Sequence, residues 1–201
     1  LALVAGVVAL VLGTILGAFR VSPVPPLRLF GATYVELVRN TPLTIVFFFF
    51  VFVAPQIGIR VPFFYSAVLA LSVYTAAFVC EAVRSGVNSV STGQAEAARS
   101  IGMTFTQSLG LVVLPQAFRT VIPPLTSIYI ALAKNTSVVA IFGVTDAAYQ
   151  MRRLSNKFTS DIWYIFVGIA AGYIIIVMTL SLILTSPWLS IASPPPRSSA
   201  R

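Results

Sequence analysis

Long apolar runs, separated by short polar or proline-containing stretches, follow one another along this chain. A helix of about 20 apolar residues is long enough to cross a bilayer. The runs predict five spans, at about Ala2–Phe19, Thr41–Pro55, Phe63–Val83, Thr120–Val144 and Ile162–Leu184. The second run is short, and we expect it to borrow part of the amphipathic stretch Leu27–Arg39. Residues 1–190 are therefore predicted to form an all-α integral membrane domain with about five transmembrane helices.

The stretches between the runs predict the connections. Phe105–Arg119 looks interfacial, and Asp146–Asp161 is polar enough to form a loop. Pro123 and Pro124 lie inside the fourth run, and we expect them to break its helix because proline removes a backbone donor and crowds the preceding turn. Residues 191–201 are rich in proline, serine and arginine, which predicts a disordered cytoplasmic tail.

The first run is interpreted as a span rather than a signal peptide. It has no basic lead-in and no small-residue cleavage site, and it ends at Arg20. The chain begins with Leu, so we expect its natural N-terminus to lie further upstream. Gly13 and Gly17 are spaced four residues apart, which favours close contact with another helix.

Composition agrees with a membrane protein and excludes several functions. Hydrophobic residues make up 58% of the chain and charged residues 9%, against about 25% charged residues in soluble domains. The net charge of +8 reflects five acidic residues rather than a basic cluster, so nucleic-acid binding is not expected. The chain has no His and a single cysteine, Cys80, so we expect no metal site, no disulfide and no cofactor.

Basic residues favour one orientation, because cytoplasmic loops carry an excess of Lys and Arg. If the first span ends in the cytoplasm, eight basic residues lie inside and four outside. The inner set is Arg20, Arg28, Arg39, Arg84, Arg99, Arg119, Arg197 and Arg201, and the outer set is Arg60, Arg152, Arg153 and Lys157. The N-terminus is then outside, and the C-terminus and the polar patch at about residues 92–103 are cytoplasmic.

This polar patch has the character of a short surface helix. It is mostly alanine, with a glycine placed where a helix would stop. A helix lying on lipid would carry bulky apolar residues on one face. The small side chains instead favour docking into a groove of another protein. The residues assigned to this contact are Gly93, Gln94, Glu96, Ala97, Ala98 and Gly102.

Four sequence blocks resemble the permease subunits of bacterial ATP-binding-cassette (ABC) importers for polar amino acids, such as glutamate, glutamine, histidine and arginine. The blocks are Arg39-Asn40-Thr41-Pro42-Leu43, Glu81-Ala82-Val83-Arg84-Ser85-Gly86, Glu96-Ala97-Ala98 with Gly102 and Leu114-Pro115, and Lys134-Asn135-Thr136-Ser137. The resemblance covers essentially the whole chain and looks closest to glutamate or glutamine permeases of actinobacterial type.

The resemblance implies a transport subunit of the bacterial cell membrane rather than an enzyme. Residues 92–103 would be the coupling loop that meets a separate cytoplasmic ATPase, since this chain has no Gly-rich Walker loop. A second permease subunit, identical or paralogous, would complete the pathway. An extracellular or periplasmic binding protein would deliver the amino-acid substrate, with glutamate or glutamine expected.

The candidate pathway residues are Lys134, Asn135, Thr136, Ser137, Glu81 and Arg84. A lysine near mid-span should face a cavity or a partner, because burying its charge in lipid costs a few kcal/mol. Lys134 is therefore expected either to attract a substrate carboxylate or to form a structural ion pair with Glu81. Glu81 and Arg84 are three residues apart and can pair with each other. Tyr74 and Thr75 are further possible lining residues.

Two other classes of protein were weighed against this interpretation. An ion-coupled secondary transporter of a small polar solute should carry several acids within its spans and often an inverted repeat. The sequence offers only Glu81 and no repeat. A membrane hydrolase or transferase would need a nucleophile with its base, and the chain has neither a histidine nor a Gly-x-Ser-x-Gly elbow.

Overall fold

The computed structural model describes residues 1–142 and 147–192, and the helices in this part of the chain confirm the all-α membrane fold. Four helical runs are long and apolar enough to cross a membrane: Ala2–Val21, Phe63–Asn88, Phe105–Ala140 and Thr159–Thr185. A fifth span is possible from a pair of helical segments, Pro25–Arg39 and Leu43–Gln56, which meet at an angle of 102°. Counted as one span, this bent pair includes the amphipathic stretch that the second run is expected to borrow.

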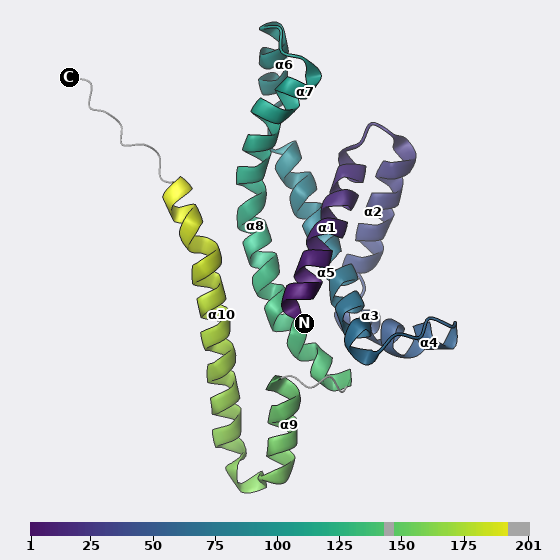
Figure 1. Ribbon diagram of the computed structural model, residues 1–201, viewed down its shortest axis with the longest axis vertical. Helices are drawn as coiled ribbons and strands as arrows, with labels where there is room; N and C mark the ends of the chain where they lie inside the picture. The colour runs from purple at the N-terminus through teal and green to yellow at the C-terminus, as the bar shows by residue number, and fades with distance from the viewer. Residues whose placement is uncertain (143–146, 193–201) are drawn as a thin grey trace, which may run out of the picture.

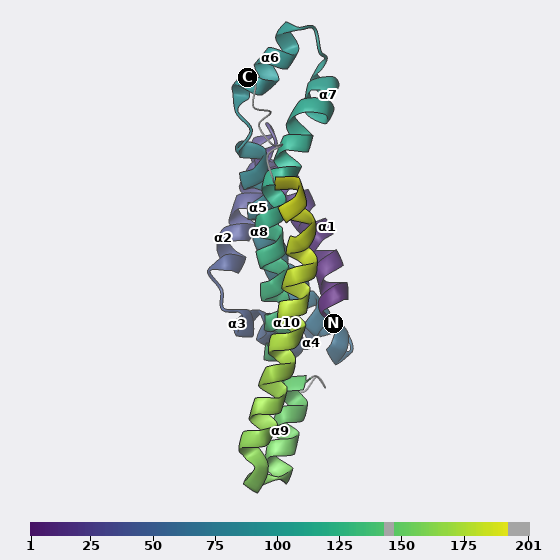
Figure 2. The same cartoon turned by 90° about the vertical axis from the view of Figure 1, so that its left-hand side faces the viewer.

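Helix α5 (Phe63–Asn88) lies at the centre of the molecule, against α1 (Ala2–Val21), α2 (Pro25–Arg39) and α8 (Leu114–Asn135). Helix α10 (Ile162–Ala192) runs along α8 on the outside (Figures 1 and 2). The short helices α6 (Thr92–Ser100) and α7 (Phe105–Ser108) lie at one end, and α9 (Ala147–Lys157) lies at the other. These two ends are called the α6 end and the α9 end.

Helix α1 packs closely on α5 because small residues line the contact. A Cβ atom on Gly13 would lie 2.5 Å from the Val79 Cβ and 2.8 Å from the Ala76 carbonyl oxygen. One turn later, a Cβ on Gly17 would lie 2.8 Å from a methyl carbon of Val83. The predicted role of the two glycines in a close helix contact is confirmed.

The contact between α5 and α8 also depends on a glycine. A Cβ atom on Gly86 would lie 2.1 Å from a methyl carbon of Val121. Further along α8, the Tyr129 hydroxyl donates a hydrogen bond of 2.8 Å to the Gly6 carbonyl oxygen of α1. The three central helices are thus fixed by small-residue contacts and by hydrogen bonds to main-chain carbonyls.

Two π-helical segments each end two residues before a proline. Phe49–Val53 precedes Pro55, which lies in α4 (Ala54–Gln56), and Leu109–Val113 precedes Pro115. A proline ring clashes with the carbonyl of the residue four positions earlier, and a wider turn gives that carbonyl room. The Leu114-Pro115 block therefore marks a widened turn at the start of α8.

The connections differ from the sequence expectations in three places. The chain is helical without interruption from Phe105 to Ala140, so no break separates the stretch expected to be interfacial, Phe105–Arg119, from the fourth span. Pro123 and Pro124 lie inside α8 and do not break it, because a helix packed among neighbours tolerates the loss of single backbone bonds. The expected polar loop Asp146–Asp161 contains the helix α9.

The ends of two helices lie beyond the expected bounds as well. Helix α5 continues past Val83 to Asn88, and α10 continues past Leu184 to Ala192. Of the expected tail at residues 191–201, the first two residues are helical, and the rest lies outside the described residues.

A substitution of Gly13 tests the seam between α1 and α5. Gly13→Ala should lower the free energy of unfolding by about 1–3 kcal/mol, because the new methyl group meets the Val79 side chain and the Ala76 backbone. Gly168→Ala in α10 is the matched control, since a Cβ there meets nothing within 4 Å and alanine favours helix. Thermal unfolding in detergent measures both variants. Equal melting temperatures would contradict the role of Gly13 in the close contact between α1 and α5.

Candidate functional site

One carboxylate, that of Glu81 on α5, is the centre of an ion-pair cluster with three arginines. Arg20 and Arg84 each form an ion pair with it, and Arg84 Nε lies 3.1 Å from Oε1. The Arg39 guanidinium is more distant, with 3.9 Å between Nη1 and the Glu81 Oε2. The expected pairing of Glu81 with Arg84 is confirmed. Three positive charges facing one carboxylate leave the cluster with an excess of positive charge.

The arginines reach Glu81 because of how their helices end. Arg20 is in the last turn of α1, and Arg39 is the last residue of α2, at the sharp bend before α3 (Leu43–Phe48). The Arg20 side chain is 17% exposed, whereas that of Arg39 is 43% exposed. The Arg20 guanidinium is therefore occupied by the Glu81 carboxylate, and Arg39 is the guanidinium most available to another anion.

A cavity of about 440 Å³ opens beside this cluster between α1, α2 and α5. Its lining residues are Arg20, Val35, Glu36, Arg39, Asn40, Phe78 and Glu81. We call it the charged cavity. It presents both guanidinium and carboxylate groups, so it can meet both charged ends of a zwitterion.

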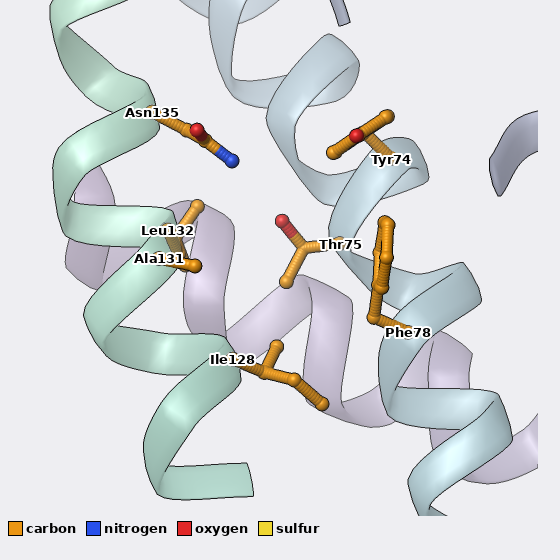
Figure 3. Close-up of a pocket in the computed structure, with 7 residues that line it drawn as sticks. All are labelled: Tyr74, Thr75, Phe78, Ile128, Ala131, Leu132 and Asn135. Carbon is orange, nitrogen blue, oxygen red and sulfur yellow. The ribbon is translucent and has the colours of Figure 1, made fainter. Parts of the chain in front are cut away.

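A second cavity, of about 230 Å³, lies between α5 and α8 (Figure 3). Its lining residues are Tyr74, Thr75, Phe78, Ile128, Ala131, Leu132 and Asn135. The Thr75 hydroxyl and the Asn135 amide point into it from opposite walls, and the other side chains are mostly apolar. We call it the upper cavity, and it has hydrogen-bonding side chains on both walls: Tyr74 and Thr75 on α5, and Asn135 on α8.

The Lys134–Ser137 block does not act as one cluster. Lys134 lies one residue before the end of α8 rather than at mid-span, and its side chain is exposed. Among the described residues the ion pairs of Glu81 are those with arginines, so the expected alternative of a Glu81–Lys134 pair is wrong. Of the four side chains, that of Asn135 lines the upper cavity.

The hydroxyls of the same block bind the end of their own helix. Thr136 Oγ1 donates to the Ala133 carbonyl oxygen and Ser137 Oγ to that of Lys134, each at 2.7 Å. Carbonyls at a helix C-terminus lack partners within the helix, and these hydroxyls satisfy two of them. Thr136 and Ser137 therefore have a structural role where α8 passes into the 3-10 segment Thr136–Phe142.

The polar patch forms a helix, α6, that ends as the sequence predicted. Gly102 has φ of +88°, its N–H donates to the Arg99 carbonyl oxygen at 3.0 Å, and the Met103 N–H donates to that of Ala98 at 3.2 Å. These two bonds form a Schellman motif, which requires a left-handed residue that glycine supplies without strain.

The side chains of α6 divide between the two faces of the helix. Gly93, Gln94, Glu96 and Ala97 are exposed, whereas Ala98 is 5% exposed. Helix α6 packs against α7 and the π-helical segment Leu109–Val113 of the same chain. Within the part of the chain that the structure describes, Glu96 forms no ion pair. A partner would therefore meet Glu96 and Ala97, with Ala98 facing inward.

Sequence reasoning missed two features of this site. It did not bring Arg20 and Arg39 to Glu81, although one acid within a span and arginines at the ends of neighbouring runs are a usable signal. It also passed over Phe78, whose ring lies 5.3 Å from the Arg39 guanidinium carbon. Nothing in the sequence distinguishes Phe78 from the other aromatic residues of the apolar runs.

Comparison with known proteins gives a match along nearly the whole chain. The family model described as "Binding-protein-dependent transport system inner membrane component" matches residues 9–189. The probable glutamine ABC transporter permease protein GlnM of Bacillus subtilis (strain 168) is 39% identical over 184 residues, covering 90% of this chain and 85% of that protein. The glutamate transport system permease protein GluC of Corynebacterium efficiens is 39% identical over 186 residues, covering 87% and 82%.

Solved structures agree with these relatives. A chain from the "Crystal structure of an amino acid ABC transporter with histidines" aligns with a TM-score of 0.87 at 28% identity, covering 94% of this chain and 88% of that one. The resemblance to amino-acid ABC permeases, glutamate permeases of Corynebacterium among them, is confirmed.

Removal of the central carboxylate tests the ion-pair cluster. Glu81→Gln leaves three arginines facing one another and should lower the free energy of unfolding by about 1–3 kcal/mol. Arg39→Gln should cost less than about 1 kcal/mol, because the Arg39 pair is long and more exposed. Melting temperatures in detergent measure both, and an Arg39→Gln variant less stable than Glu81→Gln would contradict this order.

Proposed function

The chain belongs to the family of binding-protein-dependent transport system inner membrane components, and we propose that it forms the pathway for glutamate or glutamine in an ABC importer. It is a multi-pass permease for amino acids in the bacterial inner membrane rather than an enzyme. The single observation that carries the choice of substrate is the group of glutamine and glutamate permeases at 38–39% identity over most of the chain.

Three partners follow from this proposal. A separate ATP-binding subunit hydrolyses ATP and docks on α6 at the α6 end. A second permease subunit, identical or paralogous, completes the pathway, and a substrate-binding protein delivers the amino acid at the α9 end. The N-terminus then lies outside and the C-terminus in the cytoplasm, the orientation that the excess of basic residues in the predicted inner set favours.

The pathway that we propose follows α5. The upper cavity offers Thr75 and Asn135, and the charged cavity lies further along the same helix toward the α6 end. Glu81 and Arg84 belong to the ion-pair cluster beside the charged cavity, where Arg39 is the guanidinium most available to a substrate carboxylate. Lys134 lies exposed one residue before the end of α8, and its charge is the feature that would attract an incoming carboxylate there. The hydroxyls of Thr136 and Ser137 stabilise the C-terminal end of α8 through their hydrogen bonds to its carbonyl oxygens.

An ion-coupled secondary transporter is less well supported. Such a protein needs acidic groups that exchange their counter-ion during transport. Glu81 is held by arginines from two helices besides its own, so it is not available to a coupling ion.

Uptake by the reconstituted importer tests this function. The chain, co-expressed with its ATPase and supplied with the binding protein, should take up radiolabelled L-glutamine or L-glutamate into proteoliposomes. Uptake should require ATP enclosed in the lumen, on the side of the ATPase. Lys134→Met, which keeps length and removes charge, should raise the KM with little change in kcat, because it weakens capture of the carboxylate. Uptake driven by an ion gradient without ATP would overturn the proposal, and an unchanged KM would remove Lys134 from the pathway.

Substitutions in α6 test the coupling loop. Ala97→Trp should prevent docking of the ATPase, because a close contact cannot take up the added volume. Gly102→Val should act by straining the left-handed residue, at a cost of about 1–2 kcal/mol or more, and so re-aim the helix. Both variants should lose co-purification of the ATPase while the permease stays in the membrane.

The control for this pair is Ser100→Ala. Ser100 is exposed on α6, and its Oγ donates to the Ala97 carbonyl oxygen of its own helix, so the change removes one local bond and adds no volume. Ala98→Trp is unsuitable because Ala98 is buried in this chain. Normal ATPase binding by Ala97→Trp and Gly102→Val would assign the contact to another surface.

A further inference from the structure

Phe78 lines both cavities of the candidate site. It follows Tyr74 and Thr75 of the upper cavity by one turn of α5 and precedes Glu81 of the charged cavity by three residues. Figure 3 shows its ring on the α5 wall, between Tyr74 above and the Ile128 side of the cavity below. The side chain thus lies where the two cavities adjoin.

Two contacts hold the Phe78 ring in this position. The Tyr74 ring is 5.1 Å away, centroid to centroid, and the Arg39 guanidinium carbon is 5.3 Å from the Phe78 centroid. A guanidinium within about 6 Å of a ring is attracted to its face. Arg39 belongs to α2 and Phe78 to α5, so this contact joins two helices across the junction of the cavities.

We propose that Phe78 is the gate between the upper and charged cavities, and that Arg39 holds it closed until a substrate carboxylate binds Arg39. This inference rests on the proposed function, because it takes an amino acid as the passing solute. The carboxylate wins the exchange because charge-assisted hydrogen bonds to a guanidinium are stronger than its attraction to an aromatic face.

Arg39 is suited to this exchange by its place in the cluster. Its link to Glu81, at 3.9 Å, is the longest of the three ion pairs, and its side chain is the most exposed of the three arginines. A substrate carboxylate in the charged cavity therefore competes with one weak ion pair and one cation–π contact. Arg20 and Arg84 stay on Glu81 and keep the cluster assembled while Arg39 moves.

Thiol labelling across the gate tests the proposal. Asn135→Cys places a thiol in the upper cavity, on α8 and opposite Phe78, in a Cys80→Ser background that has no other cysteine. A membrane-impermeant maleimide is added to membrane vesicles that contain the complete importer in one orientation or the other. It then reaches the protein from the α9 end in one preparation and from the α6 end in the other. With Phe78 in place, we expect labelling from the α9 end alone. Phe78→Ala should raise the labelling rate from the α6 end about tenfold or more.

Three further arms separate gating from general loosening. Phe78→Tyr keeps the ring and should label as the parent protein does. Phe64→Ala removes a phenylalanine that lines neither cavity from the same helix and should also leave the rate unchanged. L-glutamate should raise labelling from the α6 end in the parent but not in Arg39→Met, which should be partly open without it.

The outcomes distinguish this proposal from the function on which it rests. Equal labelling from the α6 end in the parent and in Phe78→Ala, or labelling from both ends in the parent, would overturn the gate. If L-glutamate does not raise the labelling rate from the α6 end in the parent, the role of the substrate carboxylate is overturned. Failure of the importer to take up any amino acid would overturn the proposed function, whereas the effect of Phe78→Ala on labelling needs no transport.

Discussion

The half-buried carboxylate of Glu81 is the constraint on which the arrangement of this protein depends. It is the acid to which arginines from α1, α2 and its own helix converge, and each of those arginines would carry an unpaired charge toward lipid without it. Arg39, the last residue of α2, lies directly before the bend to α3 and within 3.9 Å of this carboxylate. The charged cavity is the space left where the three helices meet this carboxylate.

The sequence was sufficient for the features that depend on local pattern. Apolar runs gave the spans, and Gly102 gave the end of α6, because hydropathy and left-handed geometry are properties of short segments. The sequence was misleading where neighbouring helices decide the outcome. Pro123 and Pro124 should break an isolated helix, but α8 continues through them because packing offsets the lost bonds.

The candidate site was only partly predictable for a related reason. Residues adjacent in sequence, such as Asn135 and Thr136, point to different surroundings because successive positions of a helix differ by about 100°. The block around Lys134 therefore looked like one cluster and is not one. Conversely, Arg20, Arg39 and Glu81 are far apart in sequence and meet only through helix packing, which no spacing rule can show. The role of Phe78 depends on the same convergence.

The π-helical turn at Leu109–Val113 determines how the segment between α6 and α8 responds to a change of length. A π turn accommodates one residue more than an α turn over the same rise, so the helix after it is rotated by about 100° relative to an uninterrupted α-helix. Deletion of one residue there would turn α6 and α7 by about that angle around the α8 axis. The length of this turn therefore sets the direction in which α6 faces relative to α8.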